Sequence, residues 1–183
     1  MSITSREELK NQLKEYKTIF EEEEPFVEQF FELLNAESCY LRNYLPGHIT
    51  GSAWITNHAK ERILLIHHAK LDRWLQPGGH ADGDENIFRV ALREAKEETG
   101  LKEFKLSKAG IFDLDVHTIP ARKDFPEHLH YDIRFIFEAD DNEPLIISEE
   151  SNQIAWTDYM DVIRQTGNNP SIVRMLKKIQ FLP

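Results

Sequence analysis

Hydrophobic residues recur at helical spacing near the amino terminus, whereas farther along the chain they alternate with polar residues in short runs. The helical spacing predicts one helix carrying Leu9 and a second helix opened by Pro25 and carrying Phe30. An acidic run, residues 21–24, separates them. Because acidic side chains are unfavourable at a helix C-terminus, this run is either a solvated helix end or a lead into the second helix. Together these patterns predict that residues 1–44 form a helical extension, and they show no group of residues suited to bind a metal.

From about residue 45 onward the pattern predicts one α/β domain, residues 45–183. Runs rich in β-branched and aromatic residues are typical of strands, and they occupy residues 48–56, 62–69, 104–120, 128–139 and 153–156. Helical spacing returns at residues 159–165 and 171–180. Strands on both sides of a helix, followed by closing helices, favour an α/β/α layered arrangement. The Phe-rich face of the extension is expected to pack on this domain or on a second subunit, so a homodimer is one expectation.

One longer helix is expected between the second and third strand runs. Gly100 suits the left-handed position that follows a helix, and Asp82 with Glu85 has the spacing of a capping box, with Asp84 as a second N-cap candidate. These signals predict a helix over about residues 84–99. Its apolar stripe consists of Ile87, Phe88, Ala91, Leu92 and Ala95.

Three carboxylates lie at the border of this apolar stripe. Glu94, Glu97 and Glu98 are three and four residues apart, so they cluster on one side of the helix. Partly buried like charges cost stability, which indicates a divalent cation that offsets them. Mg²⁺ is the expected ion because it prefers oxygen ligands, and Mn²⁺ is a second fitting ion. The alternative is a solvated face with a salt-bridge ladder at four-residue spacing, formed by Glu85, Arg89, Arg93 and Glu97.

The segment around this helix resembles the motif of a known family. Residues 79–101 follow the spacing Gly-x5-Glu-x7-Arg-Glu-U-x-Glu-Glu-x-Gly-U, with U an apolar residue, and this matches the Nudix box at every position. The resemblance implies a Nudix-like α/β/α sandwich and an enzyme of the Nudix hydrolase superfamily. The implied activity is metal-dependent pyrophosphohydrolysis, in which water attacks phosphorus in a nucleoside diphosphate linked to another group.

The resemblance also implies a metal-ligand set. Glu97 and Glu98 would bind the ion directly, and Glu94 would be either a further ligand or the base that accepts a proton from the attacking water. A main-chain carbonyl in the preceding glycine turn is a ligand in Nudix proteins, and that role falls on Gly78. The Gly78-Gly79 pair lets the backbone approach a ligand closely, although a plain left-handed turn would also explain both glycines.

Further roles follow from the same resemblance. Arg93 with Glu85 would orient the loop and the helix. Nudix enzymes often use a glutamate in a loop shortly before a late strand, and Glu150 is the residue we choose for this catalytic role. Its alternative is an ordinary charged loop residue.

A second polar constellation lies outside the box. His128, His130, Asp132 and Arg134 alternate along one strand run and therefore share a face, and His80 follows the glycine pair. This face is expected to line the same cleft as the carboxylate helix. It would form either a wall that contacts the substrate or an additional site for a Zn- or Mn-like ion. The alternative is a solvent-facing strand surface, since alternation alone produces a polar face.

Composition and charge restrict the function classes. The chain is 40% hydrophobic and 30% charged, as is ordinary for a globular protein, and it shows neither a signal peptide nor an apolar stretch of membrane-spanning length. A single cysteine, Cys39, excludes an internal disulfide and favours a cytoplasmic setting. The net charge of −10 argues against nucleic-acid or membrane partners and requires cations where an anionic nucleotide approaches.

Two alternatives to the hydrolase remain open at this point. A non-catalytic nucleotide-binding module would not need all three glutamates of the box. An isopentenyl-diphosphate isomerase of Nudix fold is less favoured, because its catalytic cysteine is expected within the fold and Cys39 precedes it. The substrate is expected to be a small nucleoside diphosphate derivative. ADP-ribose, dinucleoside polyphosphates, nucleotide sugars and oxidised nucleoside triphosphates all fit.

Overall fold

Two long parallel strands form the centre of the molecule. In the computed structural model, which describes residues 5–182, β1 (Gly47–Thr56) pairs with β7 (His128–Glu138) along its whole length. Six shorter strands extend this sheet by antiparallel pairing: β4 and β2 pair with β1, β5 and β6 with β7, and β3 and β8 with β2. Their bounds are β2 (Arg62–His68), β3 (Arg73–Leu75), β4 (Gly78–His80), β5 (Lys105–Leu106), β6 (Asp113–Ile119) and β8 (Ser151–Asp158).

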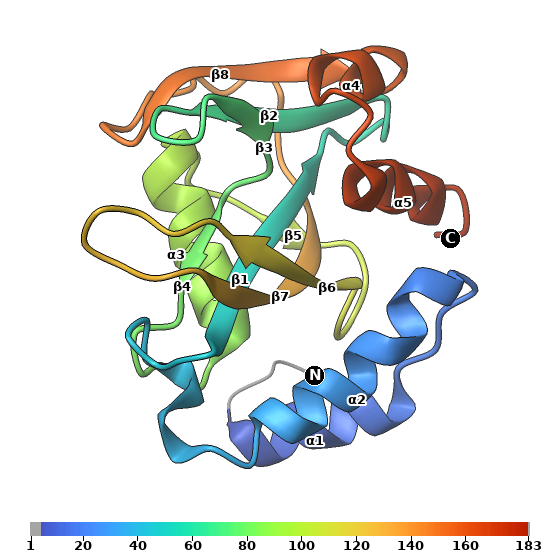
Figure 1. Ribbon diagram of the computed structural model, residues 1–183. Helices are drawn as coiled ribbons and strands as arrows, with labels where there is room; N and C mark the ends of the chain where they lie inside the picture. Colours follow the sequence, from blue (N-terminus) through green and yellow to red (C-terminus); the bar gives the residue numbers. More distant parts are fainter. Residues whose placement is uncertain (1–4, 183) are drawn as a thin grey trace.

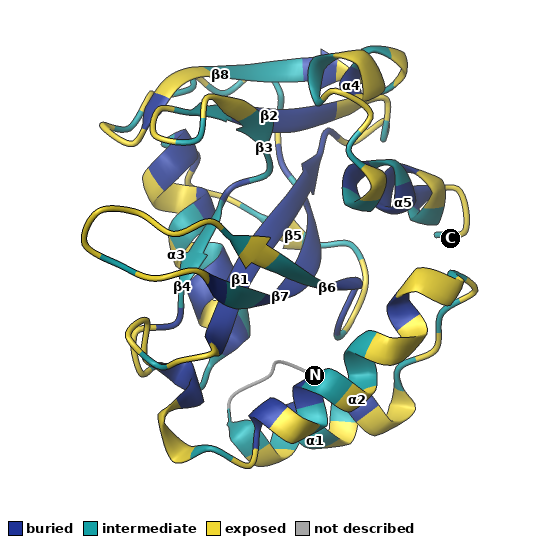
Figure 2. Ribbon diagram, in the orientation of Figure 1, coloured by how far each residue is buried: buried dark blue, intermediate teal, exposed yellow. Residues whose placement is uncertain are grey.

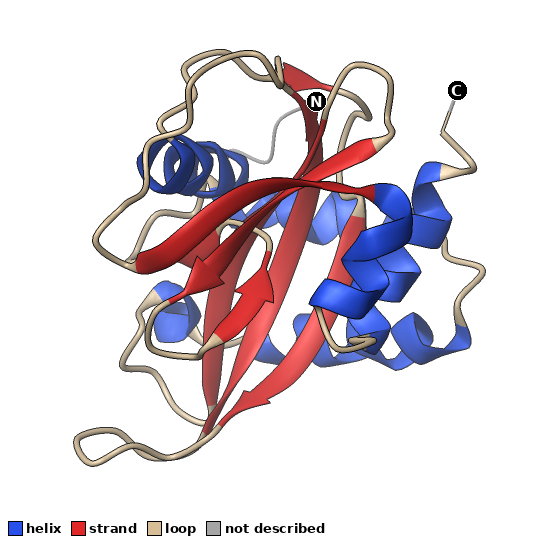
Figure 3. Ribbon diagram, turned by 90° about the horizontal axis from the view of Figure 1, so that it is seen from above, coloured by secondary structure: helices blue, strands red, loops and turns tan. Residues whose placement is uncertain are grey.

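Helices cover both faces of this sheet, as Figures 1 and 3 show. On one face lie α1 (Arg6–Glu15), α2 (Glu24–Leu33) and α3 (Ile87–Thr99), and on the other lie α4 (Tyr159–Gln165) and α5 (Pro170–Ile179). Short 3-10 helices occur at Glu21–Glu23 and Glu37–Tyr40. The expected α/β class with a layered arrangement is confirmed. None of the helices in the described residues combines the length and the apolar character needed to cross a membrane.

Several expected element boundaries need correction. The strand run expected at residues 104–120 is two strands, β5 and β6, separated by a loop. Helix α3 begins at Ile87, because the side chain of Asn86 caps it by accepting a hydrogen bond from Arg89 N at 2.9 Å. The expected capping box is absent from this helix start, since Asp82 binds Arg42 instead. The C-terminal end is as expected, with Gly100 at a φ of 76°.

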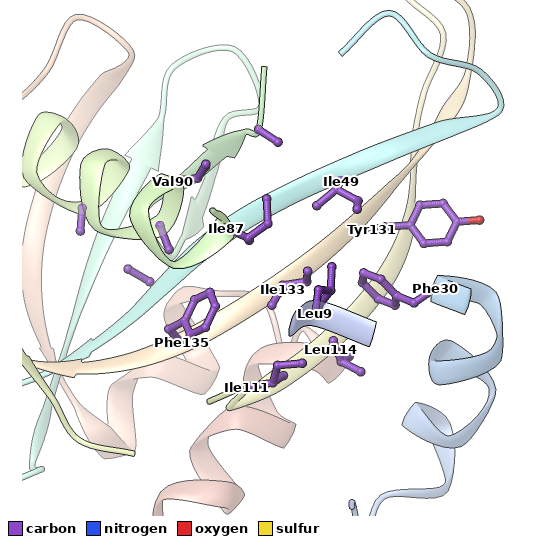
Figure 4. Packing of buried hydrophobic residues seen from close by; sticks show 14 of the residues in the cluster. Leu9, Phe30, Ile49, Ile87, Val90, Ile111, Leu114, Tyr131, Ile133 and Phe135 are labelled. Atoms are coloured by element: carbon purple, nitrogen blue, oxygen red, sulfur yellow. The ribbon is translucent and has the colours of Figure 1, made fainter. Parts of the chain in front are cut away.

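The amino-terminal helices share the core of the sheet. Leu9 of α1 and Phe30 of α2 are fully buried, and the ring of Phe30 meets that of Tyr131 edge-on at 5.4 Å between centroids. In Figure 4 both side chains lie close to Ile133 of β7, and Ile87 of α3 lies nearby in the same cluster. Figure 2 shows the buried positions following β1 and β7 and the inner faces of these helices. The extension is therefore packed on the domain.

An unexpected buried ion network joins the extension to α5. Glu23, the third residue of the acidic run, is fully buried, and the last residue of the run begins α2. The carboxylate of Glu23 accepts hydrogen bonds from Tyr16 Oη at 2.6 Å and from Lys178 Nζ at 2.5 Å. Lys178 also lies 2.8 Å from Asp113 of β6, which is paired with Arg174 at 2.9 Å. These contacts tie α5 and the amino-terminal segment to the same strand.

Candidate active site

Strand β4 and helix α3 approach each other closely at Gly78 and Gly79. Gly78 N donates a hydrogen bond to Glu98 Oε2 at 2.9 Å, and Glu98 is only 5% exposed. A Cβ atom on Gly79 would lie 2.5 Å from the carboxyl carbon of Glu94. Both glycines belong to an extended strand that pairs with β1, so the turn expected at this pair is wrong. The close approach of neighbouring side chains to the strand explains why these positions are glycine.

Burial dominates the electrostatics of the carboxylates on α3. It raises the pKa of Glu98 to about 8; the Gly78 hydrogen bond lowers that pKa, and the charges of Glu94, Glu150 and Glu97 raise it further. Burial likewise raises the pKa of Glu94, against the lowering effect of the Arg93 charge. A buried carboxylate surrounded by other acids is costly unless a cation accompanies it. The atoms available as metal ligands are carboxylate and carbonyl oxygens, which are hard ligands and therefore fit Mg²⁺ or Mn²⁺.

Arg93 and Glu85, the two residues expected to orient the box, bind different partners and not each other. Arg93 donates to Glu94 Oε1 at 2.7 Å and to the carbonyl oxygen of His80 at 3.2 Å, and so joins α3 to β4. Glu85 is bound by Arg6 at 3.2 Å. No hydrogen bond links Glu85 to Arg93 within residues 5–182. The salt-bridge ladder that was the alternative to a metal site is not formed, because Arg89 pairs with Asp84.

Glu150 is an exposed residue immediately before β8. Its carbonyl oxygen accepts a hydrogen bond from Ala69 N at 2.9 Å, which fastens this loop to the end of β2. Its charge contributes to the raised pKa values of both Glu94 and Glu98. The side chain is thus placed where its charge acts on the carboxylates of α3.

The polar face of β7 is not a solvated surface. Arg134 is 2% exposed and donates to three carboxylates, those of Asp132 at 2.8 Å and of Asp113 and Asp115 at 3.1 Å. Asp132 is also 2% exposed, and it accepts a further hydrogen bond from Ser52 at 2.8 Å. Asp132 and Arg134 were expected to contact the substrate, and this expectation is corrected. Their charged groups are buried and already paired with one another or with neighbouring carboxylates.

The sheet lies between this polar face and the body of α3. Ile133 and Phe135 alternate with the polar residues along β7 and belong to the core cluster that includes α3, whereas Arg134 lies against Met175 of α5. The expectation that the polar face and α3 line one cleft is therefore wrong. Strand β4 connects the two regions, because the carbonyl oxygen of His80 binds Arg93.

The expected histidines gather together with one that sequence reasoning missed. The ring centroids of His80 and His130 lie 5.1 Å apart, those of His128 and His130 lie 5.2 Å apart, and His48 of β1 lies within 5.1 Å of all three. Burial, followed by neighbouring positive charges, lowers the pKa of His80 to about 4 and that of His130 to about 2. His48 could not be assigned to this group from the sequence, because only the parallel pairing of β1 with β7 places it opposite His130.

Cys39 is fully buried in the core cluster, and burial raises the pKa of its thiol. A buried, protonated thiol is a poor nucleophile. The structure therefore gives no support to the isomerase alternative.

Comparison with known proteins assigns the chain to a family. The model of the NUDIX domain matches residues 48–179. A Lactococcus lactis protein named "Probable DHNTP pyrophosphohydrolase" is 29% identical over 139 residues, which are 75% of this chain and 81% of that protein. The chain therefore belongs to the Nudix family, and the prediction of a Nudix-type hydrolase of phosphoric anhydrides is confirmed at the level of the family.

Solved structures agree on the fold. An Ap4A hydrolase from C. elegans, in a binary complex, has a TM-score of 0.59 and 17% identity over 73% of this chain and 95% of its own. A bifunctional NMN adenylyltransferase/ADP ribose pyrophosphatase from Francisella tularensis, complexed with AMP and a Mn ion, has a TM-score of 0.53 and 19% identity over 84% of this chain and 46% of its own. At these identities the likeness concerns the fold alone.

Proposed function

We propose that this protein is a divalent-metal-dependent pyrophosphohydrolase that cleaves a nucleoside diphosphate linked to another group. The observation that carries the proposal is the buried carboxylate of Glu98, held by Gly78 N at 2.9 Å beside further acids of the Nudix box. A site that concentrates negative charge in this way requires cations before an anionic nucleotide can approach. A non-catalytic module would have no need for so costly an arrangement.

The ion would be held by the side chains of Glu97 and Glu98 and the carbonyl oxygen of Gly78, and Glu94 would be either a further ligand or the base that accepts a proton. Mg²⁺ is the expected ion, with Mn²⁺ as the second choice, in keeping with the manganese present in the Francisella tularensis structure. Such an ion supplies Lewis-acid stabilisation of phosphoryl oxygens and a more acidic water.

The chain itself positions the groups and accepts the proton. Arg93 holds the carboxylate of Glu94 at 2.7 Å and the backbone of β4 at 3.2 Å, so it orients that carboxylate toward the strand. Water would attack phosphorus, the anhydride P–O bond would break, and Glu94 or Glu150 would accept the proton. Glu85 would orient the loop through Arg6.

The substrate belongs to the small nucleotides. The names of the related proteins mention DHNTP, Ap4A and ADP ribose, and together with nucleotide sugars and oxidised nucleoside triphosphates they define the panel to test. The homodimer, the cytoplasmic setting and the lack of nucleic-acid and membrane partners remain predictions.

Hydrolysis of this panel tests the proposal. EDTA-treated protein should be inactive, and added Mg²⁺ or Mn²⁺ should restore the release of a nucleoside monophosphate and a second phosphorylated product. Reaction in ¹⁸O-labelled water should place the label on one of the product phosphates. Full turnover after EDTA treatment would contradict the metal requirement, and tight nucleotide binding without any cleavage would favour the non-catalytic module.

A further inference from the structure

Three histidines bring their ring nitrogens together at one end of the polar sheet face. His48 lies on β1 directly opposite His130 of β7, and His128 lies two residues before His130. One nitrogen of each ring lies within 4.8 Å of the other two. Within the part of the chain that the structure describes, this is the one group of three or more His, Cys, Asp or Glu residues that meets this criterion. The two strands are far apart in sequence, so only their pairing creates the group.

Backbone carbonyls determine which nitrogen of two rings carries the proton. His48 Nδ1 lies 3.3 Å from the carbonyl oxygen of Tyr44, and His128 Nδ1 lies 2.9 Å from that of Pro126. A carbonyl oxygen can only accept, so both Nδ1 atoms donate, and Nε2 of each neutral ring keeps its lone pair. Histidines that bind metals usually donate their other ring nitrogen to a carbonyl or a carboxylate in this way.

The free nitrogens are buried without a protein partner. Nε2 of His48 and Nε2 of His130 have no hydrogen-bond partner among the described residues. His48 is only 1% exposed, so water has little access to it from outside. A buried polar atom without a partner costs about 1–3 kcal/mol. Two such atoms in one group of neighbouring imidazoles indicate a ligand between the rings.

We propose that His48, His128 and His130 form a binding site for a transition-metal ion, with Zn²⁺ as the best-fitting ion, separate from the carboxylate site on α3. Three imidazole nitrogens suit Zn²⁺, whereas Mg²⁺ prefers oxygen atoms. Nitrogen atoms around a tetrahedral zinc ion lie about 3.4 Å apart, given Zn–N distances near 2.0–2.1 Å. Modest rotation of the rings from their separations of up to 4.8 Å therefore closes the site.

His80 is the side chain placed to supply a fourth ligand. Its ring centroid lies 5.1 Å from the centroids of both His48 and His130. Because its carbonyl oxygen binds Arg93, an ion bound at the histidine site would also stabilise the strand that supports Glu94. The proposed site is thus a structural centre next to the hydrolytic site and on the opposite side of the sheet from the body of α3.

The experiment is a zinc titration of the metal-stripped, full-length protein against a chromophoric chelator, with excess Mg²⁺ to occupy the carboxylate site. The wild type should bind one Zn²⁺ per chain. His48→Asn and His128→Asn should each weaken zinc binding by about a hundredfold or more, because each removes a ligand. His58→Asn is the matched control, since that side chain is 85% exposed and lies outside the group; it should bind zinc like the wild type.

A second measurement does not depend on the folding of the histidine variants. Bound Co²⁺ should show the intense visible absorption of a four-coordinate site with nitrogen ligands, and Glu98→Gln should retain it. Weak absorption typical of six oxygen ligands, loss of the signal in Glu98→Gln, or unchanged zinc affinity in both histidine variants would overturn the proposal. Magnesium-dependent hydrolysis by the same proteins is scored separately, so failure of the zinc site leaves the hydrolase proposal standing.

Discussion

Arg6, in the first turn of α1, binds Glu85 of the Nudix box through two donors. Its backbone N lies 3.0 Å from Glu85 Oε2, and its Nε lies 3.2 Å from Glu85 Oε1. The same guanidinium donates to the carbonyl oxygens of Ala36 at 3.0 Å and Glu37 at 2.8 Å. One side chain thus joins α1, the segment after α2 and the loop before α3. The amino-terminal helices therefore support the box without contributing a candidate ligand.

Replacing Arg6 tests this supporting role. Arg6→Ala should lower the free energy of unfolding in urea by about 1–3 kcal/mol, because it removes the guanidinium that binds Glu85 Oε1 and the carbonyl oxygens of Ala36 and Glu37, while the backbone N at position 6 still donates to Glu85 Oε2. The turnover number at saturating substrate should stay within a few-fold of wild type, since no proposed ligand is touched. Lys14→Ala, an exposed change on the same helix, is the control. Equal stability of the two variants would contradict the role, and loss of turnover with intact folding would make the extension catalytic.

Glu98→Gln should separate catalysis from folding. The rate should fall roughly a thousandfold or more, equivalent to about 4 kcal/mol of transition-state stabilisation, because a negative ligand and the charge of its ion are lost together. Metal-free stability should be unchanged or higher, because a buried amide is cheaper than a buried carboxylate and can still accept from Gly78 N. Steady-state kinetics and urea unfolding in EDTA measure the two effects. The exposed Glu103→Gln serves as the control, and a rate within about tenfold of wild type would remove Glu98 from the ligand set.

Gly79→Ala should impair activity more than stability. The added Cβ would lie 2.5 Å from the carboxylate of Glu94, a flexible side-chain end that can move away at small cost to the fold. Displacing this group by about 1 Å is expected to lower the turnover number about a hundredfold. The comparison is Gly167→Ala, where the φ of 65° adds backbone strain but no atom lies within 4 Å of the new Cβ. If Gly79→Ala keeps wild-type turnover, the position of Glu94 is not critical.

The buried ion network predicts a specific acid sensitivity. Burial alone raises the pKa of Asp113, but hydrogen bonds from Arg174 and the charges of Arg134 and Lys178 outweigh it and hold the pKa below its usual value. Since the folded-state pKa is depressed, this carboxylate stabilises the fold above its unfolded pKa of about 3.9, and the contribution is lost as pH falls below that value.

Asp113→Asn should therefore destabilise the protein by about 3–5 kcal/mol at pH 7, because buried cations lose their partner. The difference from wild type should shrink as pH falls below about 4. Urea unfolding across pH 7 to 3 measures it, with the exposed Asp124→Asn as the control. A difference that stays constant over this range would contradict the ionic origin of the stability.

Much of the secondary structure followed from local rules. The helix expected at residues 159–165 has those bounds, and α3 ends at Gly100 as the left-handed position required. The first residue of α3 was not predicted correctly. The acidic residues before the helix suggested a cap among themselves, whereas the N-cap residue is Asn86. Local pattern also separated the two faces of β7 correctly, since alternation along a strand depends only on the backbone.

The Nudix family could be recognised from the sequence, because the Nudix box is a local motif in which helical periodicity places the three glutamates on one side of the helix. The partners of the polar face of β7 could not be predicted in this way, because they depend on contacts between distant parts of the chain. Whether Arg134 meets a nucleotide or three buried carboxylates depends on strand pairing with β6 and on the placement of α5, and His48 joins His130 only because β1 and β7 run parallel. These contacts join residues whose separation in sequence is large, and no local propensity encodes which strand lies beside which.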